Sequence, residues 1–102
     1  MLRILIAEDE EPIANLIRIN LTRAGYQCTW APDGQTAADL MEREKFDLAL
    51  LDIMLPGING YELMDYAKAC ELPVIFLTAL GSTEHKVKGL RMGADDDLPK
   101  PF

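Results

Sequence analysis

The sequence has 102 residues, of which 49% are apolar and 26% charged, and it carries a net charge of −7. This length predicts one domain, residues 1–102, with a small hydrophobic core. The longest apolar run, 72–80, contains Pro73 and Thr78 and is far shorter than the roughly 18 residues that cross a membrane. Because phosphate backbones require basic side chains, the acidic balance argues against nucleic-acid binding by this domain itself. No signal-like segment opens the chain, so a cytoplasmic location is expected.

Strand patterns and helix patterns alternate from the start of the chain. A buried strand is expected over Leu2–Ala7, and acidic residues follow it directly. Pro12 suits the first turn of a helix, which is expected to stop at Gly25. Apolar and polar residues then alternate over Tyr26–Ala31, which predicts an edge strand that buries one face and packs the ring of Trp30 there.

The middle of the chain repeats this order. Asp33 is a candidate N-cap for the second helix. A third strand is expected over Phe46–Leu51, ending at Asp52. The turn signals Pro-Gly and Asn-Gly predict a loop over Ile53–Gly60, and a third helix is expected over Tyr61–Cys70.

The last third adds a fourth strand over Pro73–Leu77, ended by Thr78. A hydroxyl residue at position 82 or 83 can cap a helix that stops at Gly93, and a short fifth strand is expected within Asp95–Phe102. This alternation predicts an α/β fold with a five-stranded parallel sheet and helices on both faces. The strand order expected for such a flavodoxin-like three-layer sandwich is 2-1-3-4-5.

Four side chains capable of chemistry come at or just after the strand ends. They are Asp9, Asp52, Thr78 and Lys100. Because parallel strands all finish at the same edge of a sheet, these side chains are expected to gather there. In the predicted order the connections reverse between the first and third strands, which deliver Asp9 and Asp52, and ligands of open sheets bind at such a reversal.

The types of side chain at this edge indicate phosphoryl transfer. Glu8, Asp9 and Asp52 place up to three carboxylates together, and such a cluster suits Mg²⁺, a hard cation with oxygen ligands. Lys100 offers a compact positive charge and Thr78 a hydroxyl group. A carboxylate nucleophile with these neighbours can form an aspartyl phosphate.

The chain resembles the receiver family of bacterial two-component response regulators. The matching segments span the whole sequence and are AEDE (7–10), LLDIMLPGINGYEL (50–63), PVIFLTA (73–79) and GADDDLPKPF (93–102). The resemblance implies that Asp52 is phosphorylated and that Thr78 and Lys100 contact the phosphoryl group. The Mg²⁺ ligands that it implies are Glu8, Asp9, Asp52 and the backbone carbonyl group of Met54.

The resemblance also implies a signalling switch rather than a turnover enzyme. A sensor histidine kinase would donate the phosphoryl group, and the surface of the fourth helix and fifth strand would change on phosphorylation. That surface would be recognised by a covalently linked output domain or by a second receiver in a homodimer. The second and last matching segments, through LDIMLPG (51–57) and GADDDLPKPF (93–102), are most similar to regulators with a winged-helix DNA-binding output, so transcriptional control is expected.

The sequence departs from the family pattern in two ways. Where the family usually has an aromatic residue, three positions before the final lysine, this chain has Asp97. An ionised carboxylate resists burial in an apolar slot, so we expect weakened coupling between phosphorylation and output. The family also has a fifth helix, and the sequence ends at Phe102. A receiver without that helix is expected to be less stable or to need a partner over the exposed sheet face.

Three other functions fit parts of the pattern. A pseudo-receiver would share the fold without being phosphorylated; Asp97 favours this, whereas the complete set of Asp9, Asp52 and Lys100 opposes it. An aspartate-based phosphohydrolase generally needs a second acid where this chain has Met54. A flavin-binding electron carrier needs a phosphate loop after the first strand, and here that loop is acidic.

Overall fold

The computed structural model describes residues 2–79 and 96–100, and for residues 78, 79 and 96–100 it describes the backbone alone. The helix predicted to end at Gly93 therefore lies outside the described residues. The elements in chain order are β1 (Arg3–Ala7), α1 (Glu11–Arg23), β2 (Gln27–Ala31), α2 (Gly34–Arg43), β3 (Leu48–Asp52), α3 (Gly60–Ala69), β4 (Val74–Ala79) and β5 (Asp96–Lys100).

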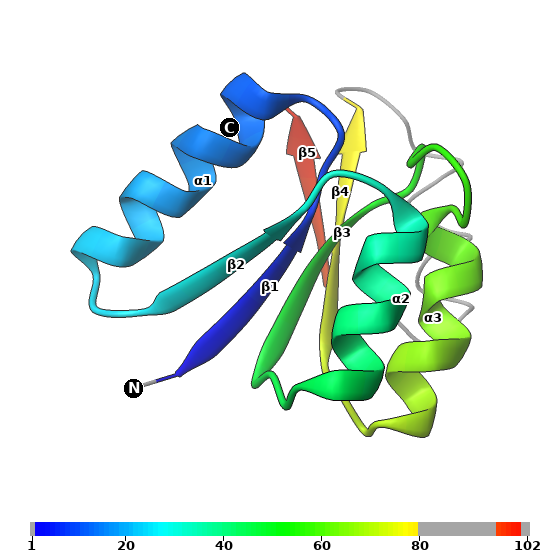
Figure 1. Ribbon diagram of the computed structural model, residues 1–102. Coiled ribbons are helices and arrows are strands. Elements are labelled where there is room, and N and C mark those ends of the chain that lie inside the picture. Colours follow the sequence, from blue (N-terminus) through cyan, green and yellow to red (C-terminus); the bar gives the residue numbers. More distant parts are fainter. Residues whose placement is uncertain (1, 80–95, 101–102) are drawn as a thin grey trace.

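The five strands form one parallel sheet in the order β2-β1-β3-β4-β5. Helix α1 covers one face of the sheet, and α2 and α3 cover the other (Figure 1). The α/β class, the flavodoxin-like layering and the strand order predicted from the sequence are confirmed. The reversal of connections falls between β1 and β3, as expected, so the site edge lies where these two strands end.

Alternate residues of the strands supply two separate hydrophobic clusters. Leu5, Leu51 and Phe76 are fully buried against α2 and α3. On the opposite face, Ile6 and Leu77 are fully buried in the cluster that includes α1. Strands β1, β3 and β4 thus pack on both faces, which explains why they read as almost continuous apolar runs.

Several predicted boundaries differ by one or two residues from the observed ones. Leu2 lies before β1 and is half exposed, and β3 begins at Leu48 rather than Phe46 and includes Asp52. Strand β4 runs on to Ala79, two residues beyond the predicted end. The extension has a cause outside the segment, because β5 pairs with β4 as far as Ala79.

The helix termini follow the predicted capping chemistry. The Asp33 carboxylate accepts from the N–H of Thr36 at 2.7 Å and caps α2. This backbone hydrogen bond lowers the pKa of Asp33 below its ordinary value. Gly25, after the end of α1, has φ = +97°, a conformation that favours glycine. Within residues 2–79 and 96–100, none of the helices is long and apolar enough to cross a membrane.

Candidate functional site

Glu8 is the first residue after β1, and strand β2 holds its backbone on both sides. The N–H of Glu8 donates to the carbonyl oxygen of Ala31 at 3.1 Å, and the carbonyl oxygen of Glu8 accepts from the indole Nε1 of Trp30 at 2.7 Å. The side chain is 0% exposed, and its Oε1 accepts from the N–H of Glu10 at 3.1 Å. These contacts direct a buried carboxylate toward the end of the sheet.

Asp52 is the last residue of β3 and is 4% exposed. Its Oδ1 accepts from the N–H of Met54 at 3.0 Å, which fixes the orientation of the carboxylate. The Met54 side chain is 71% exposed, so Met54 contacts the centre of the site through its backbone. Its predicted role as a carbonyl ligand stays a prediction.

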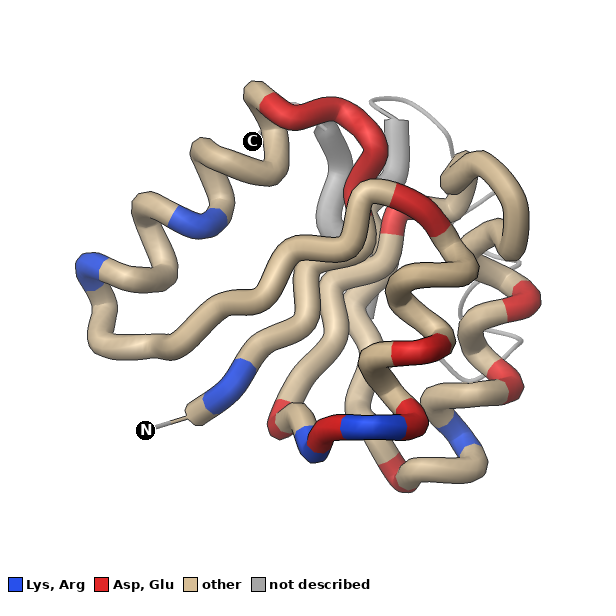
Figure 2. Tube along the Cα trace, in the orientation of Figure 1, with Lys and Arg blue, Asp and Glu red and all other residues tan. Residues whose placement is uncertain are grey.

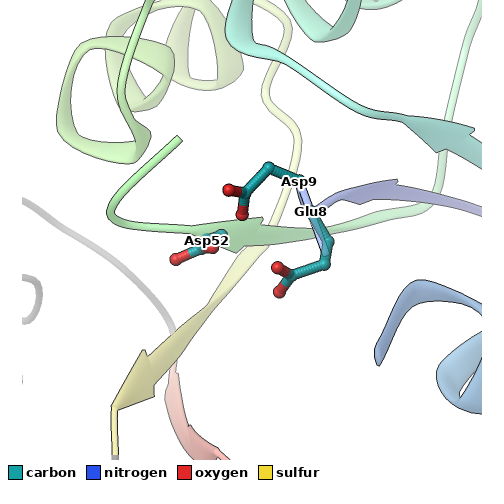
Figure 3. A group of neighbouring side chains, drawn as sticks. All are labelled: Glu8, Asp9 and Asp52. Carbon is teal, nitrogen blue, oxygen red and sulfur yellow. The ribbon is translucent and has the colours of Figure 1, made fainter. Parts of the chain in front are cut away.

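The pairing of β1 with β3 brings the acidic residues together. The last pair in this register is Ala7 with Leu51, so Glu8 and Asp52 follow at the next step on their strands. One carboxylate oxygen from each of Glu8, Asp9 and Asp52 lies within 4.8 Å of the other two, and Figure 3 shows the three groups around the end of β3. The sequence predicted this cluster, and the structure places its members together.

The cluster fits a divalent cation. Carboxylates this close repel one another, and burying their charge without a compensating positive charge is unfavourable. Glu8 and Asp52 are buried whereas Asp9 is exposed, so the cluster has a closed side and a side open to solvent. A hard cation such as Mg²⁺ takes oxygen ligands of this kind and keeps some of its water.

The loop between Asp52 and α3 is held by backbone contacts. The N–H of Gly60 donates to the carbonyl oxygen of Ile53 at 3.1 Å, and the N–H of Gly34 donates to that of Pro56 at 3.1 Å. A Cβ atom on Gly60 would lie 2.6 Å from the carbonyl oxygen of Asp52, so only glycine permits this close approach. The sequence indicated turns at this loop but not its contact with Gly34.

Thr78 and Lys100 reach the same edge through the sheet register. Asp52 pairs with Leu77, so Thr78 comes one step later on β4. Lys100 ends β5 opposite Ala79, the next residue of β4. The backbones of both predicted site residues are thus at the edge where the acidic cluster lies, while their side chains lie outside the described part of the chain.

The described charges are unevenly distributed. Figure 2 shows a run of acidic residues between β1 and α1, at the edge where the strands end. Apart from Lys100, the basic residues of the described part lie elsewhere along the chain, at the start of β1, on α1 and toward the far ends of α2 and α3: Arg3, Arg18, Arg23, Arg43, Lys45 and Lys68. The register thus brings the backbone of Lys100 to the edge that holds the acidic cluster of Glu8, Asp9 and Asp52.

Comparison with known families agrees with this arrangement. Residues 4–102 match the model of the response regulator receiver domain. The chain belongs to this family. A receiver is a signalling domain rather than a turnover enzyme, and the acidic cluster at Glu8, Asp9 and Asp52 is of the kind that binds Mg²⁺ in this family.

Solved receivers superimpose closely on this one. The receiver domain of the Francisella response regulator 1452 is 36% identical, with a TM-score of 0.90 over 100% of this chain and 86% of that chain. A putative response regulator from Chloroflexus aurantiacus is 34% identical, with a TM-score of 0.93 over 98% of this chain and 85% of that chain. A response regulator from Burkholderia pseudomallei is 27% identical, with a TM-score of 0.89 over 100% of this chain and 61% of that chain. Its structure contains a phosphorylated aspartic acid, a calcium ion and citrate.

Proposed function

We propose that this receiver accepts a phosphoryl group on Asp52 from a sensor histidine kinase, in a reaction that requires Mg²⁺. The observation that carries the proposal is the grouping of the Glu8, Asp9 and Asp52 carboxylate oxygens within 4.8 Å of one another. The phosphorylated aspartic acid and calcium ion of the Burkholderia pseudomallei relative support the same chemistry for this chain.

The arrangement of the chain's own residues suits this transfer. A carboxylate oxygen of Asp52 attacks the phosphorus atom of phosphohistidine, the O–P bond forms as the N–P bond breaks, and the imidazole leaves with the electron pair and takes a proton from water. The N–H of Met54 holds the attacking carboxylate in place. Glu8 and Asp9, with Asp52 and the Met54 carbonyl group, would hold Mg²⁺, which when bound neutralises charge on the phosphoryl oxygens.

Thr78 and Lys100 take the remaining roles in the proposal. Their strand positions and the family pattern support contact of the Thr78 hydroxyl group and the Lys100 amine with the phosphoryl oxygens. A hydroxyl donor and an ammonium group both stabilise the charge that builds up on those oxygens.

The proposal extends to what the receiver controls. Residues 1–102 would form the receiver domain of a response regulator in the cytoplasm. Phosphorylation would change the surface of β5 and the preceding segment, which an output domain or a second receiver would then bind. Two structural relatives are longer chains, since this receiver spans 24% of the Brucella abortus protein NtrX and 50% of full-length FixJ from B. japonicum. The sequence pattern favours a winged-helix DNA-binding output.

Intact-mass measurement tests the proposed acceptor. The protein is incubated with Mg²⁺ and a small phosphodonor such as phosphoramidate, and the gain of a single phosphoryl group is expected. Asp52→Asn should gain none. Asp47→Asn is the matched control, because Asp47 lies just before the opposite end of β3 and bonds to the N–H of Arg3; this variant should be phosphorylated normally. A folded wild-type protein that stays unmodified would instead identify a pseudo-receiver.

A further inference from the structure

Trp30 of the edge strand makes a hydrogen bond to the acidic turn at the site. Its indole Nε1 donates to the carbonyl oxygen of Glu8 at 2.7 Å, while the half-buried ring packs against the cluster beneath α1. The bond is possible because the register pairs Ile6 with Trp30, which places the ring next to the end of β1. An amphipathic ring thus joins the packed sheet face to the backbone of the acidic turn.

This bond controls more than one side chain. A peptide group is planar, so fixing the carbonyl oxygen of Glu8 fixes the whole unit that connects Glu8 to Asp9. That orientation determines the direction in which each of the two residues leaves the backbone. The Glu8 N–H is bonded to Ala31 at the same time, so both peptide groups of Glu8 are bonded to β2.

The Glu8 carboxylate supplies one of the hydrogen bonds that lead this turn into α1. Glu10 is the N-cap of α1, and its side chain makes no capping hydrogen bond. The Glu10 N–H instead donates to the carboxylate of Glu8, so this end of the turn depends on where Glu8 points. A change in the orientation of the peptide group between Glu8 and Asp9 would therefore move the carboxylates of both residues.

We infer that Trp30 is a positioning residue for the acidic turn, whose indole N–H orients Glu8 and Asp9 so that their carboxylates meet that of Asp52. This inference deepens, and rests on, the Mg²⁺ site of the proposed function. The ring stabilises the sheet by packing beneath α1, and the N–H orients the carboxylates of Glu8 and Asp9. These two contributions can be separated by substitution.

Mg²⁺ titration calorimetry on Trp30→Phe separates them, because phenylalanine keeps an aromatic ring and removes the donor. We expect the Mg²⁺ dissociation constant to rise about 3- to 10-fold, the effect of losing one hydrogen bond behind a metal ligand. Cys28→Ala is the matched control, since Cys28 lies two residues away on the same strand and packs in the same cluster. It should lower the unfolding temperature without changing the Mg²⁺ dissociation constant. Equal Mg²⁺ affinity of Trp30→Phe and wild type would overturn the inference.

A second measurement needs no metal and separates this inference from the proposed function. Amide hydrogen exchange at Glu10 reports the bond to the Glu8 carboxylate, and in metal-free Trp30→Phe it should be about 5-fold faster or more, as expected when a supporting hydrogen bond is lost. Unchanged exchange at Glu10 overturns the inference. A wild-type protein that binds no Mg²⁺ yet shows this difference refutes the proposed metal site while supporting the role of Trp30 in the turn.

Discussion

The N–H of Gly34, the first residue of α2, donates to the carbonyl oxygen of Pro56 in the loop that follows Asp52, at a distance of 3.1 Å. The approach is so close that a Cβ atom on Gly34 would lie 1.6 Å from the carbonyl oxygen of Ile58. The start of α2 therefore supports the loop that carries Met54, and through Met54 it supports the carboxylate of Asp52.

Gly34→Ala should thus impair the site from a distance. The added methyl group forces the loop to move, because the atoms it meets belong to the backbone. We expect the rate of phosphorylation by a small phosphodonor to fall about 10-fold or more, because misplacing reacting groups by about 1 Å slows enzymatic reactions by at least that much. Gly25→Ala is the control, since position 25 has φ = +97° and open space for a methyl group. It should lose about 1–2 kcal/mol of stability and keep the wild-type rate. A normal rate in Gly34→Ala would contradict the support by α2.

Asp52→Asn is expected to stabilise the metal-free protein. In the presence of a chelator, the three carboxylates repel one another, and removing one charge relieves the repulsion. We expect the free energy of unfolding in urea to rise by about 1 kcal/mol or more, since two like charges about 4 Å apart repel by about 1 kcal/mol in water and more strongly where they are buried. Added Mg²⁺ should then stabilise wild type more than the variant, because it binds the folded wild-type site more tightly. Asp47→Asn should show no gain, and a destabilised Asp52→Asn would argue against repulsion in the cluster.

The acidic cluster could be predicted because it depends on topology alone. Parallel strands end at the same edge, so the register of Ala7 with Leu51 brings Glu8 and Asp52 together whatever the details of packing. The ends of the strands were less predictable. Residues 78 and 79 belong to β4 because β5 pairs with them, and this pairing joins segments distant in sequence.

The contacts of Trp30 and Gly34 could not be predicted for the same reason. Alternation in the sequence predicted that Trp30 packs on a covered face of β2, and its half-buried ring does pack beneath α1; the prediction that β2 buries one face alone was wrong, since Ala31 on the other face is 0% exposed. The acceptor of the Trp30 N–H depends on the register of β2 against β1. A half-buried indole usually finds a hydrogen-bond acceptor, so the sequence predicts that the Trp30 N–H has one but does not identify it. Gly34 meets a loop more than twenty residues away, and no local pattern encodes that contact.

Lowering the pH should destabilise wild type more than the variant Asp33→Asn. Hydrogen bonding from the backbone of Thr36 lowers the pKa of Asp33 in the folded protein. Its contribution to stability is therefore fully present above the ordinary carboxyl pKa and is lost as the pH falls through the lower folded value. Asparagine is an equally good cap and does not titrate in this range, so Asp33→Asn should lose less stability than wild type between about pH 7 and about pH 3. Urea midpoints at the two pH values measure this, and identical losses would contradict it.

Fluorescence should report metal binding directly. The chain has a single tryptophan, so its emission comes from Trp30 alone. Because the indole N–H is bonded to the Glu8 carbonyl group, a cation that draws the acidic turn toward Asp52 should change the emission intensity or wavelength. Glu8→Gln should need higher Mg²⁺ for the same change. Emission that stays constant while calorimetry shows Mg²⁺ binding to wild type would show that the ring does not sense the site.

Asp97 is the residue whose substitution tests the coupling of phosphorylation to output. The register pairs Asp97 with Phe76, which is 0% exposed and packs edge-to-face on Tyr61 with ring centroids 5.7 Å apart. An ionised carboxylate at a position paired with Phe76 resists transfer into an apolar environment, whereas a tyrosine at the same position can be buried at modest cost. Asp97→Tyr should therefore strengthen self-association on addition of beryllofluoride and Mg²⁺ about 5-fold or more, the lower end of typical allosteric coupling.

Analytical ultracentrifugation with and without beryllofluoride measures this response. Asp96→Tyr is the matched control, because the neighbouring position pairs with Ile75 and not with Phe76. It adds the same side chain to the same strand, so it should leave the response at the wild-type level. Equal beryllofluoride-dependent association of wild type and Asp97→Tyr would show that the carboxylate at this position does not weaken the switch.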